Sequence, residues 1–152
     1  MRETDMNATF ERFREHLPVG GHLTLMILKG HLLVEEQVII LIENRIAKFR
    51  SLKDADLTTH QKICLAEALI EEHCPNGEDA WLWPAIKKLN MLRNDIAHNL
   101  AKAGVEDRVV DFVRRVPKKM GSKNLCHNFE FALWVTCAEV HCLIEIPNPA
   151  DA

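Results

Sequence analysis

The sequence lacks a Cys-x-x-Cys pair, although it contains five cysteines. Because their number is odd and this spacing is absent, a disulfide framework is not expected, and reduced thiols predict a cytoplasmic protein. His60 with Cys64, and Cys137 with His141, have the four-residue spacing that would place two zinc ligands on one helical face. Cysteine is, however, commonly buried as a small hydrophobic side chain. We therefore predict neither a metal site nor another cofactor.

A long uncharged apolar run is also missing. The longest apolar stretch, 22–42, is interrupted by charged residues that include Lys29 and Glu35, whereas a membrane span needs about 20 residues with almost no charge. The first five residues, Met-Arg-Glu-Thr-Asp, lack the charged and then apolar order of a secretory leader. These absences predict a protein without a membrane segment, in which 22–42 forms a buried helix.

Several familiar catalytic motifs are absent as well. There is no glycine-rich phosphate loop, no pair of catalytic carboxylates and no Gly-x-Ser-x-Gly turn. The chain has 152 residues, of which 47% are hydrophobic, and this length is enough for one globular core but too short for two comfortable ones. Since repeats, linkers and low-complexity tracts are also missing, we expect residues 1–152 to form a single domain.

The apolar residues recur at helical spacing, and no stretch alternates long enough to predict a strand. Turn residues such as the Gly20-Gly21 pair and Pro117 separate the periodic segments. The predicted fold class is therefore all-α, a bundle of about five to six helices. The expected helices cover about 8–17, 23–49, 58–72, 83–104, 105–116 and 124–144. The second is apolar on more than one side, which indicates a central helix or one that contacts a partner chain.

One polar sequence late in the fourth expected helix, Arg-Asn-Asp-Ile-Ala-His at 93–98, has the residue types of an RNA-cleaving site. Histidine exchanges a proton near neutral pH, arginine carries a permanent planar cation that fits a phosphate, and asparagine adds an amide donor and acceptor. At about 100° per residue, Asn94 and His98 lie about 40° apart on one helical face, whereas Arg93 lies about 140° from His98. Arg93 and His98 therefore reach one point only if the long arginine wraps round or a second copy of the chain contributes.

These residue types match what RNA cleavage requires. RNA carries its own nucleophile, the ribose 2′-hydroxyl, and its cleavage needs a base for that hydroxyl, an acid for the leaving oxygen and a cation for the phosphorane. Two copies of such a site can supply all three, and activity on RNA rather than DNA is predicted. The structural alternative is that His98 interacts with the helix dipole at a C-terminus, while Asn94 and Asp95 belong to a solvated face.

The charges are unevenly distributed. The net charge is -3, yet 86–123 contains ten Lys or Arg residues against four Asp or Glu residues. A basic segment beside a phosphate site would concentrate RNA there, although a solvated surface loop is the alternative. The residues predicted to bind RNA are Arg114, Arg115, Lys118, Lys119 and Lys123.

The other polar and aromatic residues are interpreted as structural. Glu35 and Glu36 could direct an acid toward the cleft, but solvation or pairing with a lysine is the simpler expectation. The three tryptophans are predicted to anchor the core, although Trp81 could instead stack on a base. The remaining histidines lack a neighbouring arginine and polar residue; they are His16, His22, His31, His60, His73, His127 and His141.

With Arg93, a polar Asn94 and His98 after four intervening residues, the segment resembles the signature of the HEPN superfamily. The resemblance implies an up-and-down core of four or more helices, usually dimeric, with the motifs of two subunits meeting in a shared cleft. It also implies a metal-independent endoribonuclease of the kind found in toxin–antitoxin, phage-defence and RNA-processing systems, so that RNA, a second copy and an antitoxin are the expected partners. Other proteins of this superfamily do not cleave and instead bind a nucleotide, RNA or a protein. Arg93, Asn94 and His98 carry over as the catalytic residues.

Overall fold

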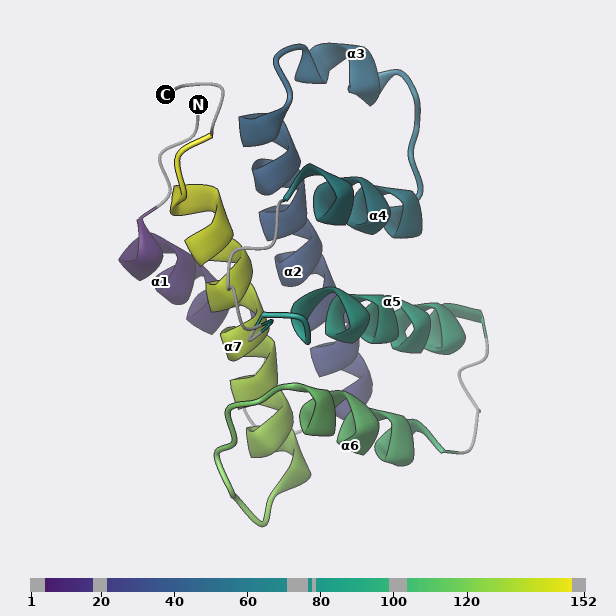
Figure 1. Ribbon diagram of the computed structural model, residues 1–152. Helices are drawn as coiled ribbons and strands as arrows, with labels where there is room; N and C mark the ends of the chain where they lie inside the picture. The colour runs from purple at the N-terminus through teal and green to yellow at the C-terminus, as the bar shows by residue number, and fades with distance from the viewer. Residues whose placement is uncertain (1–4, 18–21, 71–76, 78, 99–103, 149–152) are drawn as a thin grey trace.

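The computed structural model describes residues 5–17, 22–70, 77, 79–98 and 104–148 (Figure 1). Within them the chain forms seven α-helices and no β-strand, which confirms the predicted all-α fold class. The helices are α1 (Met6–His16), α2 (Leu23–Arg45), α3 (Phe49–Lys53), α4 (Thr59–Leu69), α5 (Leu82–His98), α6 (Val105–Arg115) and α7 (Leu125–Glu145). None of these described helices has the length and apolar character needed to cross a membrane.

Helix α2 lies at the centre of the molecule, packed against α7 on one side and against α4 and α5 on another (Figure 1). At its end, Arg45 donates hydrogen bonds to the carbonyl oxygens of Leu143 (3.0 Å) and Ile146 (2.9 Å). Nearer its start, Gly30 faces Leu133. Because the early parts of both helices meet and the late parts of both helices meet, α2 and α7 run in the same direction. Figure 1 shows α4, α5 and α6 lying across this pair, a layered arrangement rather than a plain alternation of direction.

The end of α2 differs from the sequence prediction. The apolar spacing predicts one helix over 23–49, but α2 ends at Arg45 and the separate helix α3 begins at Phe49. The backbone of Ile46 is extended, with φ of -115° and ψ of 123°, and the chain changes direction there. Ile46 and Phe49 still pack against the core, so the apolar spacing continues in the sequence after the helix has ended. The periodicity therefore predicts a helix that is too long and omits α3.

The start of α4 agrees with the start of the helix predicted over 58–72. The side chain of Thr58 accepts a hydrogen bond from the backbone N–H of Gln61 (3.2 Å), and the side chain of Gln61 accepts one from the backbone N–H of Thr58 (2.9 Å). This capping box satisfies two backbone donors that a helix start leaves open. The predicted start at 58–59 is confirmed. The predicted ends of this helix and of the next one fall on or beside residues outside the described part of the chain.

Most of the apolar surface of α2 is covered within one chain. Ile27 and Leu41 are fully buried, since α4, α5 and α7 pack around the helix. This arrangement agrees with the prediction of a central helix. A narrow strip remains, because Leu25 and Leu32 are 41% and 58% exposed. On α2, only this exposed strip is available for contact with a partner chain, because most of the rest of its apolar surface is buried within the chain.

Candidate functional site

Helix α5 carries the Arg-Asn-x3-His motif, and α6 lies antiparallel to it. Lys88 in the first half of α5 pairs with Asp111 in the second half of α6 (2.8 Å). Asp95 near the end of α5 pairs with Arg108 near the start of α6. The two ion pairs align the helices, and the end of α5 lies at one edge of the molecule (Figure 1).

Arg93 and Asn94 are in contact near this end of α5, and His98 follows one helical turn after Asn94. The Nη1 atom of Arg93 donates a hydrogen bond to Oδ1 of Asn94 (3.1 Å), and both side chains are half-buried. His98 is the last residue of α5 and is exposed. Its position four residues after Asn94 places the two on the same face of the helix. The Arg93 side chain therefore points toward the face that Asn94 shares with His98. Helical geometry requires this direction if the three residues are to act on one substrate.

This arrangement has a defined chemical capacity. The hydrogen bond to Asn94 uses one of the five N–H donors of the Arg93 guanidinium. The other donors of a guanidinium are of the type that binds phosphate oxygens. The Asn94 carboxamide nitrogen adds a second type of donor. The exposed imidazole of His98 can exchange protons with a bound substrate or with solvent. Together these groups could hold a phosphodiester and transfer one proton.

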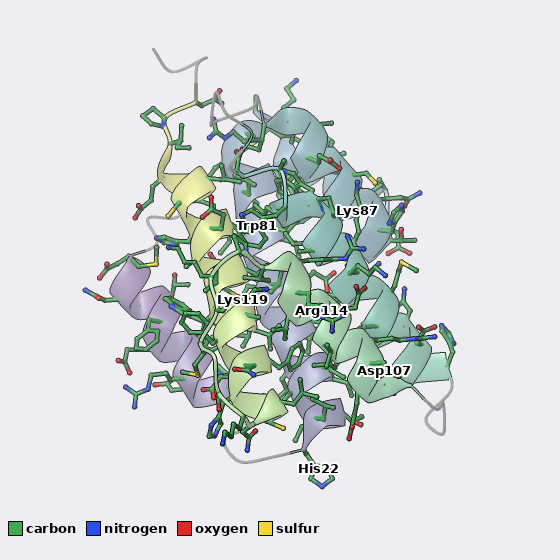
Figure 2. All side chains as sticks on the ribbon, turned by 60° about the horizontal axis from the view of Figure 1, so that its bottom comes forward. His22, Trp81, Lys87, Asp107, Arg114 and Lys119 are labelled. Carbon is green, nitrogen blue, oxygen red and sulfur yellow. The ribbon has the colours of Figure 1, made fainter. Side chains whose placement is uncertain are left out.

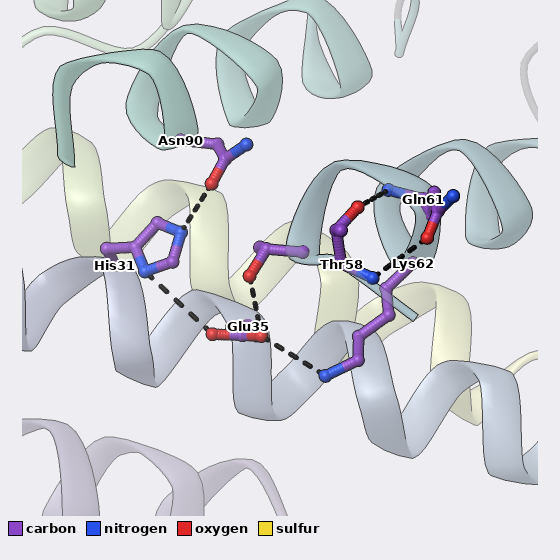
Figure 3. Close-up of polar contacts among 7 residues, drawn as sticks. His31, Glu35, Thr58, Gln61, Lys62 and Asn90 are labelled. Carbon is purple, nitrogen blue, oxygen red and sulfur yellow. Dashed lines mark hydrogen bonds and ion pairs between the residues drawn. The ribbon is translucent and has the colours of Figure 1, made fainter. Parts of the chain in front are cut away.

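A buried polar contact lies one helical turn earlier on α5, where the helix crosses α2. The Nε2 atom of His31 lies 3.1 Å from Oδ1 of Asn90 (Figure 3), and the two residues are only 3% and 4% exposed. Because an amide oxygen only accepts hydrogen bonds, Nε2 donates and Nδ1 is the unprotonated nitrogen. This Nδ1 faces the carboxylate of Glu35 at 3.9 Å. The contact fixes the position of α5, and therefore of the motif, relative to the central helix.

Glu35 extends this contact to a third helix. Its carboxylate accepts a hydrogen bond from Thr59 Oγ1 (3.0 Å) and one from Lys62 Nζ (3.4 Å), both on α4 (Figure 3). Glu36 is paired with Arg12 of α1 at 2.8 Å. Both glutamates thus have cationic partners, in agreement with the simpler of the two sequence interpretations. Glu35 ties α2 to α4 and is not directed toward His98.

His31 is the residue near the site that the sequence analysis did not single out. No arginine or polar residue is its neighbour in the sequence, yet Asn90 and the charge of Arg93 are near it in space. The signal that could have found it is on α5, where Asn90, Asn94 and His98 repeat every four residues and form one polar stripe. A polar residue in that stripe among buried leucines indicates a buried hydrogen-bond partner on another helix.

The pKa of His31 reflects these surroundings. Burial lowers this pKa below its usual 6.5, and the positive charge of Arg93 lowers it further. The Glu35 carboxylate and the hydrogen bond with Asn90 raise the pKa, but burial has the larger effect. His31 is consequently neutral in the folded protein at neutral pH, in agreement with its role as a hydrogen-bonded buried side chain.

This pKa shift predicts a pH-dependent stability. When the pH falls, His31 is protonated in the unfolded chain at a higher pH than in the folded protein. The contribution of neutral His31 to the free energy of unfolding is therefore complete above about pH 6.5 and decreases as the pH falls below that value. We expect the free energy of unfolding to decrease more steeply between about pH 7.5 and 5.5 in the wild type than in His31→Gln, by at most about 1.4 kcal/mol per pH unit. Urea unfolding measures the slope, with the exposed His22→Gln as the control. Parallel curves for wild type and His31→Gln would contradict the prediction.

The predicted RNA-binding residues lie away from the motif. Arg114 and Arg115 are at the far end of α6 from His98, a separation of about 15 Å along the helix, and Figure 2 shows Arg114 and Asp107 at different ends of α6. Arg115 pairs with Asp111 (3.6 Å). The three lysines, Lys118, Lys119 and Lys123, follow in the exposed segment between α6 and α7. One chain therefore does not bring these basic residues beside the motif.

Lys119 has a local contact of its own. Its Nζ atom donates a hydrogen bond to the backbone carbonyl of Val113. Burial lowers the pKa of Lys119, and the nearby charge of Arg114 lowers it further. The segment after α6 is thus anchored to the end of that helix, and Arg114 and Lys119 belong to one basic surface.

The two Cys and His pairs do not form a shared ligand set. His60 Nε2 and Cys64 Sγ are 3.6 Å apart on α4. Cys137 is buried in the core, and burial raises the pKa of its thiol to about 12. His141 lies within hydrogen-bonding distance of Thr9 (3.3 Å) and Glu145 (3.0 Å). Within the described ranges, no three or more His, Cys, Asp or Glu side chains are grouped so that they could hold a metal ion.

No protein-family model matches the chain, and no curated protein or solved structure is significantly similar to it. The fold and the site thus define an all-helical protein with an Arg-Asn-x3-His motif at the exposed end of one helix. Any assignment of function depends on the chemistry of that motif.

Proposed function

We propose that this protein is a metal-independent endoribonuclease of the HEPN type. The observation that carries the proposal is the contact at the end of α5, where the Arg93 guanidinium bonds to Asn94 (3.1 Å) and the exposed His98 follows on the face that Asn94 occupies. A cation, an amide and a titratable imidazole near one exposed point are what the cleavage of RNA by its own 2′-hydroxyl requires.

In the proposed reaction, the 2′-hydroxyl attacks the adjacent phosphorus and the bond to the 5′-oxygen of the next nucleotide breaks. One His98 takes the proton from the 2′-hydroxyl, and a protonated His98 of a second copy gives a proton to the leaving 5′-oxygen. Arg93 stabilises the negative charge of the phosphorane, and Asn94 orients the scissile phosphate or His98. The products are a 2′,3′-cyclic phosphate end and a 5′-hydroxyl end.

A homodimer is part of this proposal, because one chain supplies a single His98 for two proton transfers. Exposed apolar side chains support a contact between copies: Met91 on α5 is 60% exposed, and Leu25 and Leu32 on α2 are 41% and 58% exposed. Met91 lies within two turns of His98 on the exposed side of α5. Burial of such side chains against a second copy would stabilise a dimer, and burial of Met91 would place the contact within two turns of His98.

A second function is favoured by the separation of the basic residues from His98. An RNA-binding protein that does not cleave needs the lysines and arginines after Val113 but not a titratable group beside them. Such a non-catalytic helical module would bind RNA, a nucleotide or a partner protein. The toxin role, with an antitoxin as partner, belongs only to the nuclease proposal.

The test is incubation of the purified protein with single-stranded RNA and with DNA of the same sequence, each with and without a chelator. We expect RNA cleavage that persists with the chelator, leaves 2′,3′-cyclic phosphate ends and leaves DNA intact. Light scattering on the same preparation reports the number of copies. Cleavage that stops on chelation contradicts the proposed mechanism, and salt-sensitive RNA binding without cleavage assigns the second function.

A further inference from the structure

A cavity of about 230 Å³ lies between α1 and α7, on the side of the molecule away from the end of α5 (Figure 1). Four aromatic side chains line it: Phe10 and Phe13 from α1, and Phe131 and Trp134 from α7. Met120, from the segment that joins α6 to α7, completes the apolar part of the wall. Aromatic residues make up only 6% of the chain, so this cavity contains a large share of them.

The aromatic rings are held at angles to one another. The Phe10 and Trp134 rings meet edge to face, with centroids 4.8 Å apart, and Phe13 lies 5.5 Å from the same indole. Such pairs are rigid and favourable. Phe10 and Met120 are nevertheless 37% and 56% exposed. The cavity therefore has a preformed aromatic wall that is open to solvent at its edge, and Trp134 is part of this wall as well as of the core.

The segment that carries Met120 is rich in basic residues. Met120 lies in the sequence between Lys118, Lys119 and Lys123, all of which are exposed. The guanidinium of Arg14 sits 5.8 Å from the centre of the Phe10 ring and 3.8 Å from the Glu11 carboxylate, and His127 also lines the cavity. Glu130 also lines the cavity, so the lining itself is mixed in charge while the segment at its edge is strongly basic.

We propose that this cavity binds one unpaired base of single-stranded RNA. Aromatic rings accept any base by stacking, and the exposed lysines that neighbour Met120 in the sequence would neutralise the phosphates on either side of it. The volume lies below the roughly 300–1,000 Å³ of sites that enclose drug-sized ligands. It therefore suits a flat ring system whose sugar and phosphate remain outside, beside Lys118, Lys119 and Lys123.

This inference rests on the proposed function for the choice of RNA as ligand, and it adds a subsite to it. The cavity lies between α1 and α7, and His98 is the last residue of α5. Because Figure 1 shows α1 and the end of α5 on opposite sides of the bundle, the bound base is not the one whose phosphate is cut. The subsite contributes affinity for unpaired RNA and leaves the chemical step to the end of α5. It also gives the lysines after α6, which lie away from His98, a role in binding RNA.

The test compares two octamers on the full chain by fluorescence anisotropy. One is an oligoadenylate with 2′-O-methyl sugars, which cannot be cut by its own 2′-oxygen, and the other is its abasic counterpart with the same phosphates. The wild type is expected to bind the oligoadenylate about tenfold more tightly. Trp134→Leu and the more conservative Phe10→Leu are each expected to reduce this preference several-fold, whereas Ser51→Ala, an exposed change on α3, leaves it unchanged.

A triple change of Lys118, Lys119 and Lys123 to Gln is expected to weaken binding of both octamers by a similar factor, so that their ratio is preserved. Equal binding of the two octamers by the wild type overturns the inference. A ratio that survives in both Trp134→Leu and Phe10→Leu also overturns it. If the wild type binds neither octamer, the inference is also overturned, and an apolar protein segment becomes the candidate ligand of the cavity. Cleavage of unmodified RNA is measured separately, so failure of the subsite and failure of the nuclease proposal give different results.

Discussion

Replacement of His98 by alanine is expected to lower the rate of RNA cleavage by at least about a hundredfold, the usual contribution of a general acid or base. The expectation follows from the exposed position of His98 at the end of α5, on the face that it shares with Asn94. Because the side chain is exposed, the free energy of unfolding should change by less than about 0.5–1 kcal/mol, including its interaction with the helix dipole. Initial rates on a fluorogenic single-stranded RNA measure the first effect, and urea unfolding measures the second.

The matched control for this change is His22→Ala, because His22 is also an exposed histidine but lies at the start of α2. It should retain full activity. The pH–rate profile adds a second criterion, since a bell shape is expected if one copy of His98 acts as base and another as acid. Activity of His98→Ala equal to that of His22→Ala would remove His98 from the mechanism and leave the RNA-binding function as the remaining proposal.

Replacement of Gly30 by valine is expected to destabilise the fold by about 2 kcal/mol through overpacking. A Cβ atom at this position would lie 2.5 Å from Cδ1 of Leu133 and 3.3 Å from its Cγ. Leu133 is fully buried in α7, so the leucine has little room to move away. The close approach of α2 and α7 therefore depends on glycine, even though valine has the better helix propensity. The midpoint of urea unfolding measures the loss.

A second substitution separates this clash from other causes. Leu133→Ala alone should cost about 3 kcal/mol because it leaves a cavity. The double variant Gly30→Val with Leu133→Ala should cost less than the sum of the two, by about 1 kcal/mol or more, since the valine then fills part of that space. Lys29→Val, at an exposed neighbouring position on α2, should change stability by less than about 0.5 kcal/mol. Simple additivity in the double variant would show that steric contact with Leu133 is not the cause.

Much of the fold could be predicted because its signals are local. The helical spacing of apolar residues predicts the all-helical class, and a threonine at 58 or 59 predicts the start of α4 as an N-cap. The structure completes this start with a capping box within four consecutive residues. The same locality applies to the motif. Asn94 and His98 share a face because they are four residues apart in one helix, and that relation holds wherever the helix lies in the molecule.

Other features could not be predicted because they depend on contacts between distant segments. The end of α2 at Arg45 is one, since the guanidinium of that residue bonds to the carbonyl oxygens at the end of α7, about 100 positions away. The pairing of His31 with Asn90 is another. Each of these residues looks unremarkable beside its sequence neighbours, and its role is defined only where α5 crosses α2.

The sequence by itself determined the helical class, the start of α4 and the order of the three motif residues along one helix, because periodicity and capping act within a few residues. The tertiary structure alone decided that α2 and α7 run in the same direction, that His31 supports α5 from the core, and that Met120, in the basic segment after α6, lines an aromatic cavity between α1 and α7. These features depend on which helices pack against each other. Close packing selects the partners by the shapes of whole helix faces, and a short sequence segment does not contain that information.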